Sequence, residues 1–231
     1  SELALNPPEE GFEVGDSLSG TVPSSSAPGP CSDFTQGAGT AYKVGGSYPG
    51  FYVRTASIPS NVGTTNGVNA IRNALTGLVS HANDCGETRD PNVLDFPYNG
   101  AASNTGNFTS AGDCASLDSV NVVDFGVLSG DAVARFCLTY VNGRTTAYDI
   151  RMDSARSWDY TLTDGCHNNN AWDITSALTH EWGHVYGLSH VAESTSPNLT
   201  MSLLFNGTCQ VSERTLGRGD MDHMFAKYGY K

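Results

Sequence analysis

The sequence predicts an α+β fold, in which helices pack against a mixed, twisted sheet. Three observations predict it. A segment with apolar residues at helical spacing comes early, at residues 68–82; short strand-like segments then follow as far as residue 153. Two more helical patterns close the chain, around residue 180 and at 216–229. Strands grouped between helices, rather than alternating with them, are typical of this class.

The first 82 residues contain three expected elements. Residues 1–40 are rich in Pro, Gly and Ser and show no sustained period, so we expect an extended N-terminal arm, fastened to the body through Cys31. The alternating run GFYVRTAS predicts a first strand at residues 50–57. VNAIRNALTGLVSHA, residues 68–82, predicts the first helix.

Further strand-like runs are separated by Gly and Asn turns, and they cover residues 93–98, 119–126, 133–142 and 146–153. We expect the last two to form a hairpin about Asn142 and Gly143, because Asn-Gly favours tight turns between strands.

Residues 180–190 read HEWGHVYGLSH and fit HExxHxxGxxH at every fixed position. His180 and His184 are four residues apart, so on a helix both imidazoles project from one face. Gly187 permits the positive φ that ends a helix, so the chain can bring His190 back to the same ion. Three neutral imidazoles leave the fourth corner of a tetrahedral zinc open to water, as in catalytic sites.

Glu181 lies next to the first of these histidines and is a candidate general base. Zinc lowers the pKa of a bound water from about 16 towards roughly 7. Glu181 is placed to take the proton of that water and later deliver it to a leaving amine. HExxH alone also occurs by accident on exposed helices, and a zinc site without catalysis could keep the same residues; the added glycine and third histidine favour a zinc hydrolase.

The extended motif resembles that of the metzincin zinc endopeptidases, whose members also carry a methionine in a tight turn beneath the zinc. Met201, in SPNLTMS, is the candidate for this Met-turn. Met221 and Met224 are rivals by position, but both lie in a later helical pattern. Leu203 stands where astacin-like and serralysin-like enzymes place a tyrosine, which disfavours those two families.

The order of segments resembles the matrixins over roughly residues 50–230, and the shorter bacterial matrixin-like secreted proteases are the closer likeness. The similar segments are DSVNVVDFG (118–126), TAYDIRMD (146–153) and LGRGDMDHMFAKYG (216–229). The resemblance implies a metzincin-like α+β fold with a twisted, mixed five-stranded sheet, one antiparallel edge strand and three main helices. It also implies an active-site cleft between an upper and a smaller lower subdomain.

The same resemblance divides the chain into three parts: the arm at 1–40, an upper catalytic subdomain at 41–190 with the sheet and the zinc-binding helix, and a lower subdomain at 191–231 with the Met-turn and the C-terminal helix. It makes 133–142 the edge strand above the cleft, where a peptide can bind as an added strand. It also makes 191–205 a wall of the pocket for the side chain after the cut bond.

Two aspartates flank the helices of the candidate site. Asp173 precedes the catalytic helix and is expected to cap its N-terminus. Asp220 opens the final helix and is expected to form hydrogen bonds beneath the active site.

The six cysteines are even in number and lack the paired spacing of a zinc ribbon, so we expect three disulfides and an oxidising compartment. Six cysteines allow 15 pairings; we favour Cys166 with Cys209. Cys31, in PGPCSD, also invites comparison with the propeptide cysteine that inhibits animal matrixins through their zinc.

A formal net charge of −12 with few lysines disfavours nucleic acid and anionic membrane surfaces as partners. No segment is long and apolar enough to cross a membrane. The chain opens at Ser1 on a polar, acidic stretch, so we interpret it as a processed, mature form. Acidic composition and the resemblance make Ca²⁺ a candidate second cofactor, although no EF-hand spacing occurs.

Motif and resemblance together predict a secreted, extracellular and monomeric zinc-dependent endopeptidase that acts on protein or peptide substrates. The alternative is a non-catalytic secreted zinc protein that binds extended peptides at its edge strand. Glu181 favours the enzyme, because metal binding requires the histidines but not that carboxylate.

Overall fold

The computed structural model describes residues 27–45, 50–80, 82–161, 170–204 and 207–231. Within them lies a five-stranded sheet of order β2-β1-β3-β5-β4, whose strands are parallel except for the antiparallel edge strand β4. The strands are β1 Phe51–Val53, β2 Tyr98–Ala101, β3 Asn121–Gly126, β4 Ala134–Val141 and β5 Arg144–Asp153. The predicted mixed sheet with one antiparallel edge strand is confirmed.

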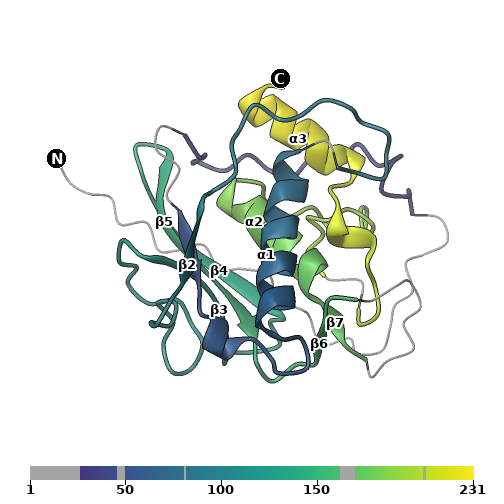
Figure 1. Ribbon diagram of the computed structural model, residues 1–231. Helices are drawn as coiled ribbons and strands as arrows, with labels where there is room; N and C mark the ends of the chain where they lie inside the picture. Colours follow the sequence, from purple (N-terminus) through teal and green to yellow (C-terminus); the bar gives the residue numbers. More distant parts are fainter. Residues whose placement is uncertain (1–26, 46–49, 81, 162–169, 205–206) are drawn as a thin grey trace.

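In the described residues three α-helices accompany the sheet, as predicted: α1 Thr64–Val79, α2 Ile174–Val185 and α3 Arg218–Tyr228. Two short 3₁₀ turns, η1 Thr55–Ser57 and η2 Ser212–Arg214, precede α1 and α3. Helices α1 and α2 lie side by side against the sheet, and α3 crosses above them at the C-terminal end of the chain (Figure 1). The core between these layers includes Phe51, Ile71 and Trp182, each fully buried.

Helix α1 is present but begins and ends earlier than predicted. It starts at Thr64, directly after Gly63 with φ +76°, and it gives way to an extended backbone at Ser80. Its buried positions keep the expected helical period, and they are Gly67, Ala70, Ile71, Ala74, Leu75, Leu78 and Val79. The apolar period could not reveal the first turn, because Thr64, Thr65 and Asn66 are polar and not buried.

The strand predicted at residues 93–98 is wrong, because β2 begins only at Tyr98. Val93 and Phe96 are buried, but they are three residues apart and so do not alternate as a strand requires. Pro97 has no N–H for a ladder; its carbonyl accepts from the Phe51 amide at 2.9 Å and leads into the parallel pairing of β1 with β2.

The predicted hairpin of β4 and β5 is confirmed. Its two turn residues, Asn142 and Gly143, have φ of +53° and +71°, so both occupy the left-handed region that this tight turn requires. Val141 pairs with Arg144 directly across the turn.

A second, two-stranded parallel sheet was not predicted. It joins β6 Trp158–Asp159 to β7 Trp172–Asp173 and leads directly into α2. The Asp173 carboxylate accepts from the Ser176 amide at 2.8 Å, which confirms it as the cap of α2. Arg214 pairs with the same carboxylate at 2.9 Å through Nε, an ion pair that the sequence did not indicate.

Two complete disulfides join described residues, Cys31 to Cys85 and Cys114 to Cys137. Cys209 is disulfide-bonded as well, but Cys166, its predicted partner, lies outside the described residues. The comparison of Cys31 with an inhibitory zinc ligand is wrong, because its sulfur is engaged with Cys85. None of the described helices is long and apolar enough to span a membrane.

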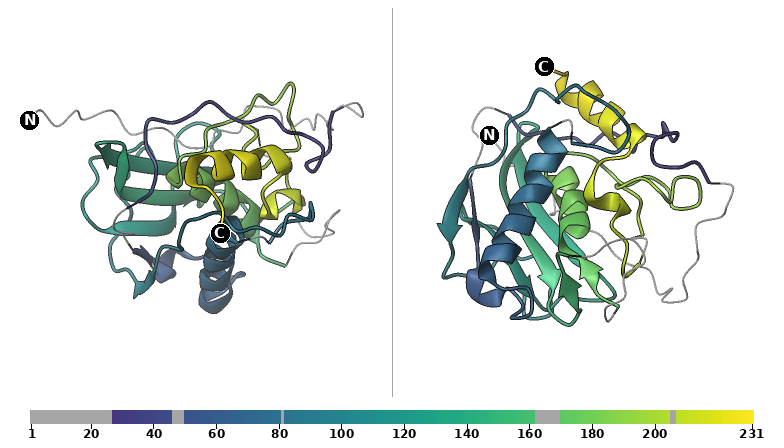
Figure 2. Two further views of the ribbon diagram at one scale, coloured as in Figure 1. Left: turned by 90° about the horizontal axis from the view of Figure 1, so that it is seen from above. Right: turned by 45° about the vertical axis from the view of Figure 1, so that its right-hand side comes forward.

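The described part of the N-terminal segment runs along α3. The Pro30 carbonyl accepts from the Arg218 amide at 2.7 Å, and Lys227 donates to the Thr40 hydroxyl at 2.8 Å, near the other end of the helix. Figure 2 shows this segment in purple beside the yellow α3. The division of the chain into arm, upper and lower subdomains stays a prediction.

Candidate metal centre

Three histidine side chains converge at one point. His180 and His184 lie one turn apart on α2, and His190 follows after the helix has ended. Their Nε2 atoms form a nearly equilateral triangle: His180 to His184 is 3.0 Å, His184 to His190 is 3.0 Å, and His180 to His190 is 3.1 Å. The motif therefore gathers the three predicted residues.

The outer ring nitrogens of the two helical histidines face backbone carbonyls. His180 Nδ1 lies 2.7 Å from the Thr200 carbonyl, and His184 Nδ1 lies 2.9 Å from the Leu188 carbonyl. A carbonyl can only accept, so each Nδ1 carries the proton and each Nε2 lone pair faces the centre of the triangle. Sequence reasoning did not find these two carbonyls, since every residue carries one and the side-chain pattern gives no signal.

Burial keeps the imidazoles neutral. It lowers the pKa of His180 and of His184 well below the ordinary value, with further repulsion from the neighbouring rings, and it lowers the pKa of His190 to about 4. Neutral imidazoles are the form that binds a metal ion.

The triangle fits a zinc ion. Zinc–imidazole bonds of about 2.0–2.1 Å in a tetrahedron place the nitrogens roughly 3.3 Å apart, close to the separations here. The three histidines offer ligand atoms within 4.8 Å of one another. Among the described residues, these three histidines form the one group of His, Cys, Asp or Glu side chains that could hold a metal ion. Ca²⁺ stays a prediction from composition and from the resemblance.

Local backbone geometry brings His190 back to the helix. Gly187 has φ +86°, and its amide donates to the His184 carbonyl at 2.7 Å, so α2 ends there as predicted. The Leu188 amide then donates to the Gly183 carbonyl at 2.9 Å and closes the turn. His190 is thereby placed outside the helix yet within reach of both helical histidines.

Met201 is fully buried and lies against α2, the helix that carries two of the histidines. Its sulfur is so close to α2 that a Cβ on Gly183 would lie 2.5 Å from it. The Val191 amide donates to the Met201 carbonyl at 2.9 Å, which links the residue after the third histidine to this turn. Met221 and Met224, the rivals by position, lie on α3.

Asp220 supports the same turn from α3, where it is buried. Its carboxylate accepts from the Thr200 amide at 2.9 Å and from the Gly217 amide at 3.2 Å, and it also accepts from the Met201 amide. Burial raises the pKa of Asp220 to about 7. Asp220 thus forms hydrogen bonds as expected, and one of them reaches Thr200, whose carbonyl faces His180.

Glu181 follows His180 on α2 and is fully buried. Phe136 of β4 stacks on the His184 ring, with centroids 4.6 Å apart and planes inclined by 21°. This contact places the antiparallel edge of the sheet beside the histidine cluster. A buried carboxylate, three converging imidazoles and an adjacent strand edge can together support metal-assisted hydrolysis of a bound chain.

Comparison with protein families agrees with this class. The matrixin family model matches residues 130–229, a little under half of the chain, from just before β4 to the end of α3. A comparison with curated proteins gives no significant match. Fold and site together define a metzincin-like metallopeptidase. The match supports a matrixin-like metzincin, and the matched segment contains all three histidines, Glu181 and Met201.

Proposed function

We propose that the protein is a secreted zinc-dependent endopeptidase that cleaves protein or peptide substrates. The observation that carries the proposal is the triangle of three Nε2 atoms, 3.0–3.1 Å apart. Glu181, fully buried, follows the first of these histidines on α2. The matrixin match over this segment supports the same reaction class.

In this proposal His180, His184 and His190 hold the zinc through their Nε2 atoms. When bound, zinc supplies a Lewis acid that acidifies water and polarises a carbonyl. The Glu181 carboxylate accepts the proton of the attacking water and returns it to the nitrogen of the departing amine. The Thr200 and Leu188 carbonyls keep the protons of His180 and His184 on Nδ1, so that both Nε2 atoms stay available.

Substrate binds along β4 in this proposal. This strand ends the sheet, and its edge can accept an extended peptide as an added strand through main-chain hydrogen bonds. The stacking of Phe136 on His184 supports this placement, because it holds the edge beside the ligands. Residues 191–205 would then line the cleft beyond the cut bond.

The disulfides support an extracellular location, since such bonds persist in oxidising compartments. An excess of acidic residues supports substrates other than nucleic acid or anionic membrane. We take the working unit to be a monomer.

The test is cleavage of unfolded casein by the zinc-loaded protein, with and without a chelator, beside Glu181→Ala with its zinc content measured. We expect chelator-sensitive cleavage, and we expect Glu181→Ala to lose roughly a hundred- to ten-thousandfold in kcat/KM while retaining zinc. Asp95→Ala is a matched control, because it also removes a carboxylate, from an exposed position where it accepts from the Thr76 hydroxyl of α1. Absence of cleavage by the zinc-loaded wild type would instead support a non-catalytic peptide-binding protein.

A further inference from the structure

Residues 37–42 of the N-terminal segment, here called the strap, lie against the turn between the second and third histidines. The sequence predicted an arm, and the one contact with the site that it suggested, through Cys31, is wrong. Ala38 accepts a hydrogen bond from the Ser189 hydroxyl through its carbonyl, and the Thr40 hydroxyl lies 2.9 Å from the Gly187 carbonyl. The Tyr42 hydroxyl, fully buried, donates to the His184 carbonyl at 3.0 Å.

These contacts satisfy the end of α2. The last carbonyls of a helix have no partners within it, and they need donors from elsewhere. The strap places hydroxyls at two carbonyls here. Tyr42 donates to the His184 carbonyl, which also accepts from the Gly187 amide. The Thr40 hydroxyl lies between the Gly187 carbonyl, just past the helix, and the Tyr42 carbonyl at 2.8 Å. Helix α3 provides another, because the Tyr228 hydroxyl donates to the Tyr186 carbonyl at 2.5 Å.

The strap packs closely against the backbone between Gly187 and His190. A Cβ on Gly37 would overlap the Ser189 carbonyl and lie 2.9 Å from the His190 carbonyl. A Cβ on Gly187 would lie 2.7 Å from the Tyr42 carbonyl and 2.9 Å from the Thr40 hydroxyl. The backbone that carries the third histidine is therefore in direct contact with the strap.

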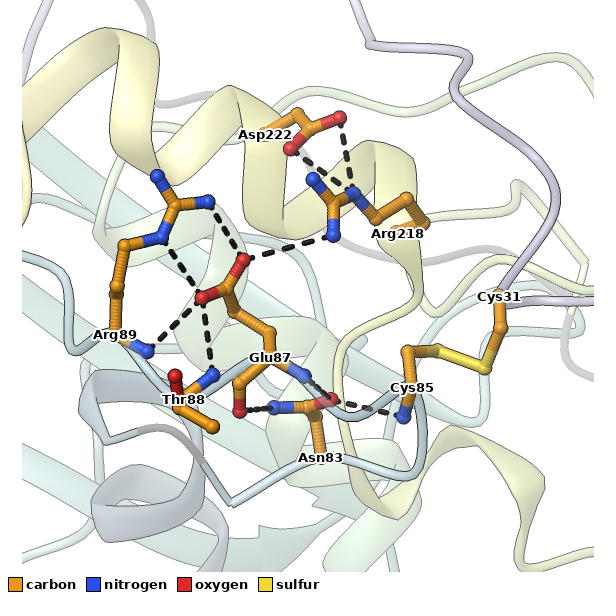
Figure 3. A network of polar contacts seen from close by, with 8 residues as sticks. All are labelled: Cys31, Asn83, Cys85, Glu87, Thr88, Arg89, Arg218 and Asp222. Carbon is orange, nitrogen blue, oxygen red and sulfur yellow. Dashed lines mark hydrogen bonds and ion pairs between the residues drawn. A yellow bond between two sulfur atoms is a disulfide. The ribbon is translucent and has the colours of Figure 1, made fainter.

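Both ends of the strap are anchored. On one side, Cys31 is bonded to Cys85, whose loop holds Glu87 between Arg89 and Arg218 of α3 (Figure 3). On the other side, the Lys43 amide donates to the Gly143 carbonyl at 3.0 Å, at the β4–β5 turn. A segment attached at two places can hold in position the turn that packs against it.

We propose that the strap positions His190, so that the N-terminal segment contributes to metal binding by orienting the third ligand. The proposal rests on the zinc site proposed above. Helix α2 fixes His180 and His184 by its own hydrogen bonds, whereas His190 lies beyond the helix end and depends on the turn at 186–190. Partners that orient a metal ligand typically change metal affinity about 10- to 100-fold.

Zinc affinity, measured by competition with a chromogenic chelator, tests the proposal in two matched pairs. Gly37→Val should weaken zinc binding at least about tenfold, whereas Gly39→Val should not, because no atom lies within 4 Å of its Cβ position. Thr40→Val removes the hydroxyl near the Gly187 carbonyl and should weaken binding, whereas Thr40→Ser keeps the hydroxyl and should bind like the wild type.

The same substitutions in a His190→Ala background separate positioning from general loss of structure. If the strap acts through His190, Gly37→Val and Thr40→Val should have no further effect on zinc affinity once that imidazole is absent. Equal affinity of all strap variants in the wild-type background, or an undiminished effect in the His190→Ala background, would overturn the proposal. Failure of the wild type itself to bind zinc would overturn the proposed function, and the strap's role with it.

Discussion

The Asp220 carboxylate accepts a hydrogen bond from the Thr200 amide at 2.9 Å, and the Thr200 carbonyl in turn holds His180 Nδ1 at 2.7 Å. One peptide segment thus joins helix α3 to the first histidine of α2. Because both contacts are buried, the position of that imidazole depends on a residue 40 positions later in the chain.

Asp220→Ala should lower the free energy of unfolding by about 3 kcal/mol, since it leaves buried amide donors without their acceptor. Asp220→Asn retains an acceptor oxygen and should cost less. Urea unfolding of the metal-free protein measures both. Asp222→Ala, on the same helix, breaks a partly exposed pair with Arg218 and should cost at most about 1 kcal/mol. Equal losses for Asp220→Ala and Asp222→Ala would contradict the supporting role of Asp220.

Gly183→Ala should destabilise the protein by about 1–3 kcal/mol, because the added methyl would lie 2.5 Å from the Met201 sulfur. In a Met201→Ala background the same substitution finds space, so the double variant should lose less than the sum of the two single ones. Calorimetric unfolding of all four proteins measures this coupling. Gly77→Ala in α1 is the control: it meets nothing closer than 3.9 Å and should stabilise the helix by about 0.5–1 kcal/mol. Additive losses would show that Met201 is not in contact with α2.

Substitutions of Asp173 separate its two roles. Asp173→Asn can still cap α2 but cannot pair with Arg214 as an ion, and it should cost about 1 kcal/mol, because the guanidinium is partly exposed. Asp173→Ala loses cap and pair and should cost about 2 kcal/mol. Denaturant titration checks the order, and equal costs for the two variants would mean that the cap contributes nothing.

Glu87 should make stability depend on acid pH. Its hydrogen bond from the Arg89 side chain, together with backbone amides, lowers the pKa of Glu87 from 4.5 to about 2. The folded state therefore favours the carboxylate, and this stabilisation is complete above about pH 4.5 and is lost as the pH falls towards 2. Melting temperatures of the wild type and Glu87→Gln should differ at pH 6 and converge on acidification. A constant gap across this range would count against the pKa shift.

Much of the site could be predicted from the sequence because it is local. His180, His184 and Gly187 act within one helix and its end, where spacing along the chain determines spacing in three dimensions. The Asn142–Gly143 turn is local in the same way, so its hairpin was predicted correctly.

Contacts between distant segments could not be predicted. The pairing of Asp173 with Arg214 and the strap across the turn before His190 join residues whose types are compatible with many partners. The error at residues 93–98 has a different cause: two buried anchors, Val93 and Phe96, gave an apolar signal without a strand's alternation.

The strand order also has a consequence for how the chain folds. Strands β4 and β5 adjoin in sequence, and such hairpins form in about 1–10 µs. Strand β1 instead pairs only with strands that come later in the chain, because Phe51 pairs with Tyr98 of β2 and Asn121 of β3. Pairings across such separations slow folding.

During synthesis, moreover, α2 emerges after every strand of the five-stranded sheet. We therefore expect the nascent sheet to expose an apolar face until the histidine-bearing helix covers it, so that a late step in burying the core also brings the metal ligands together.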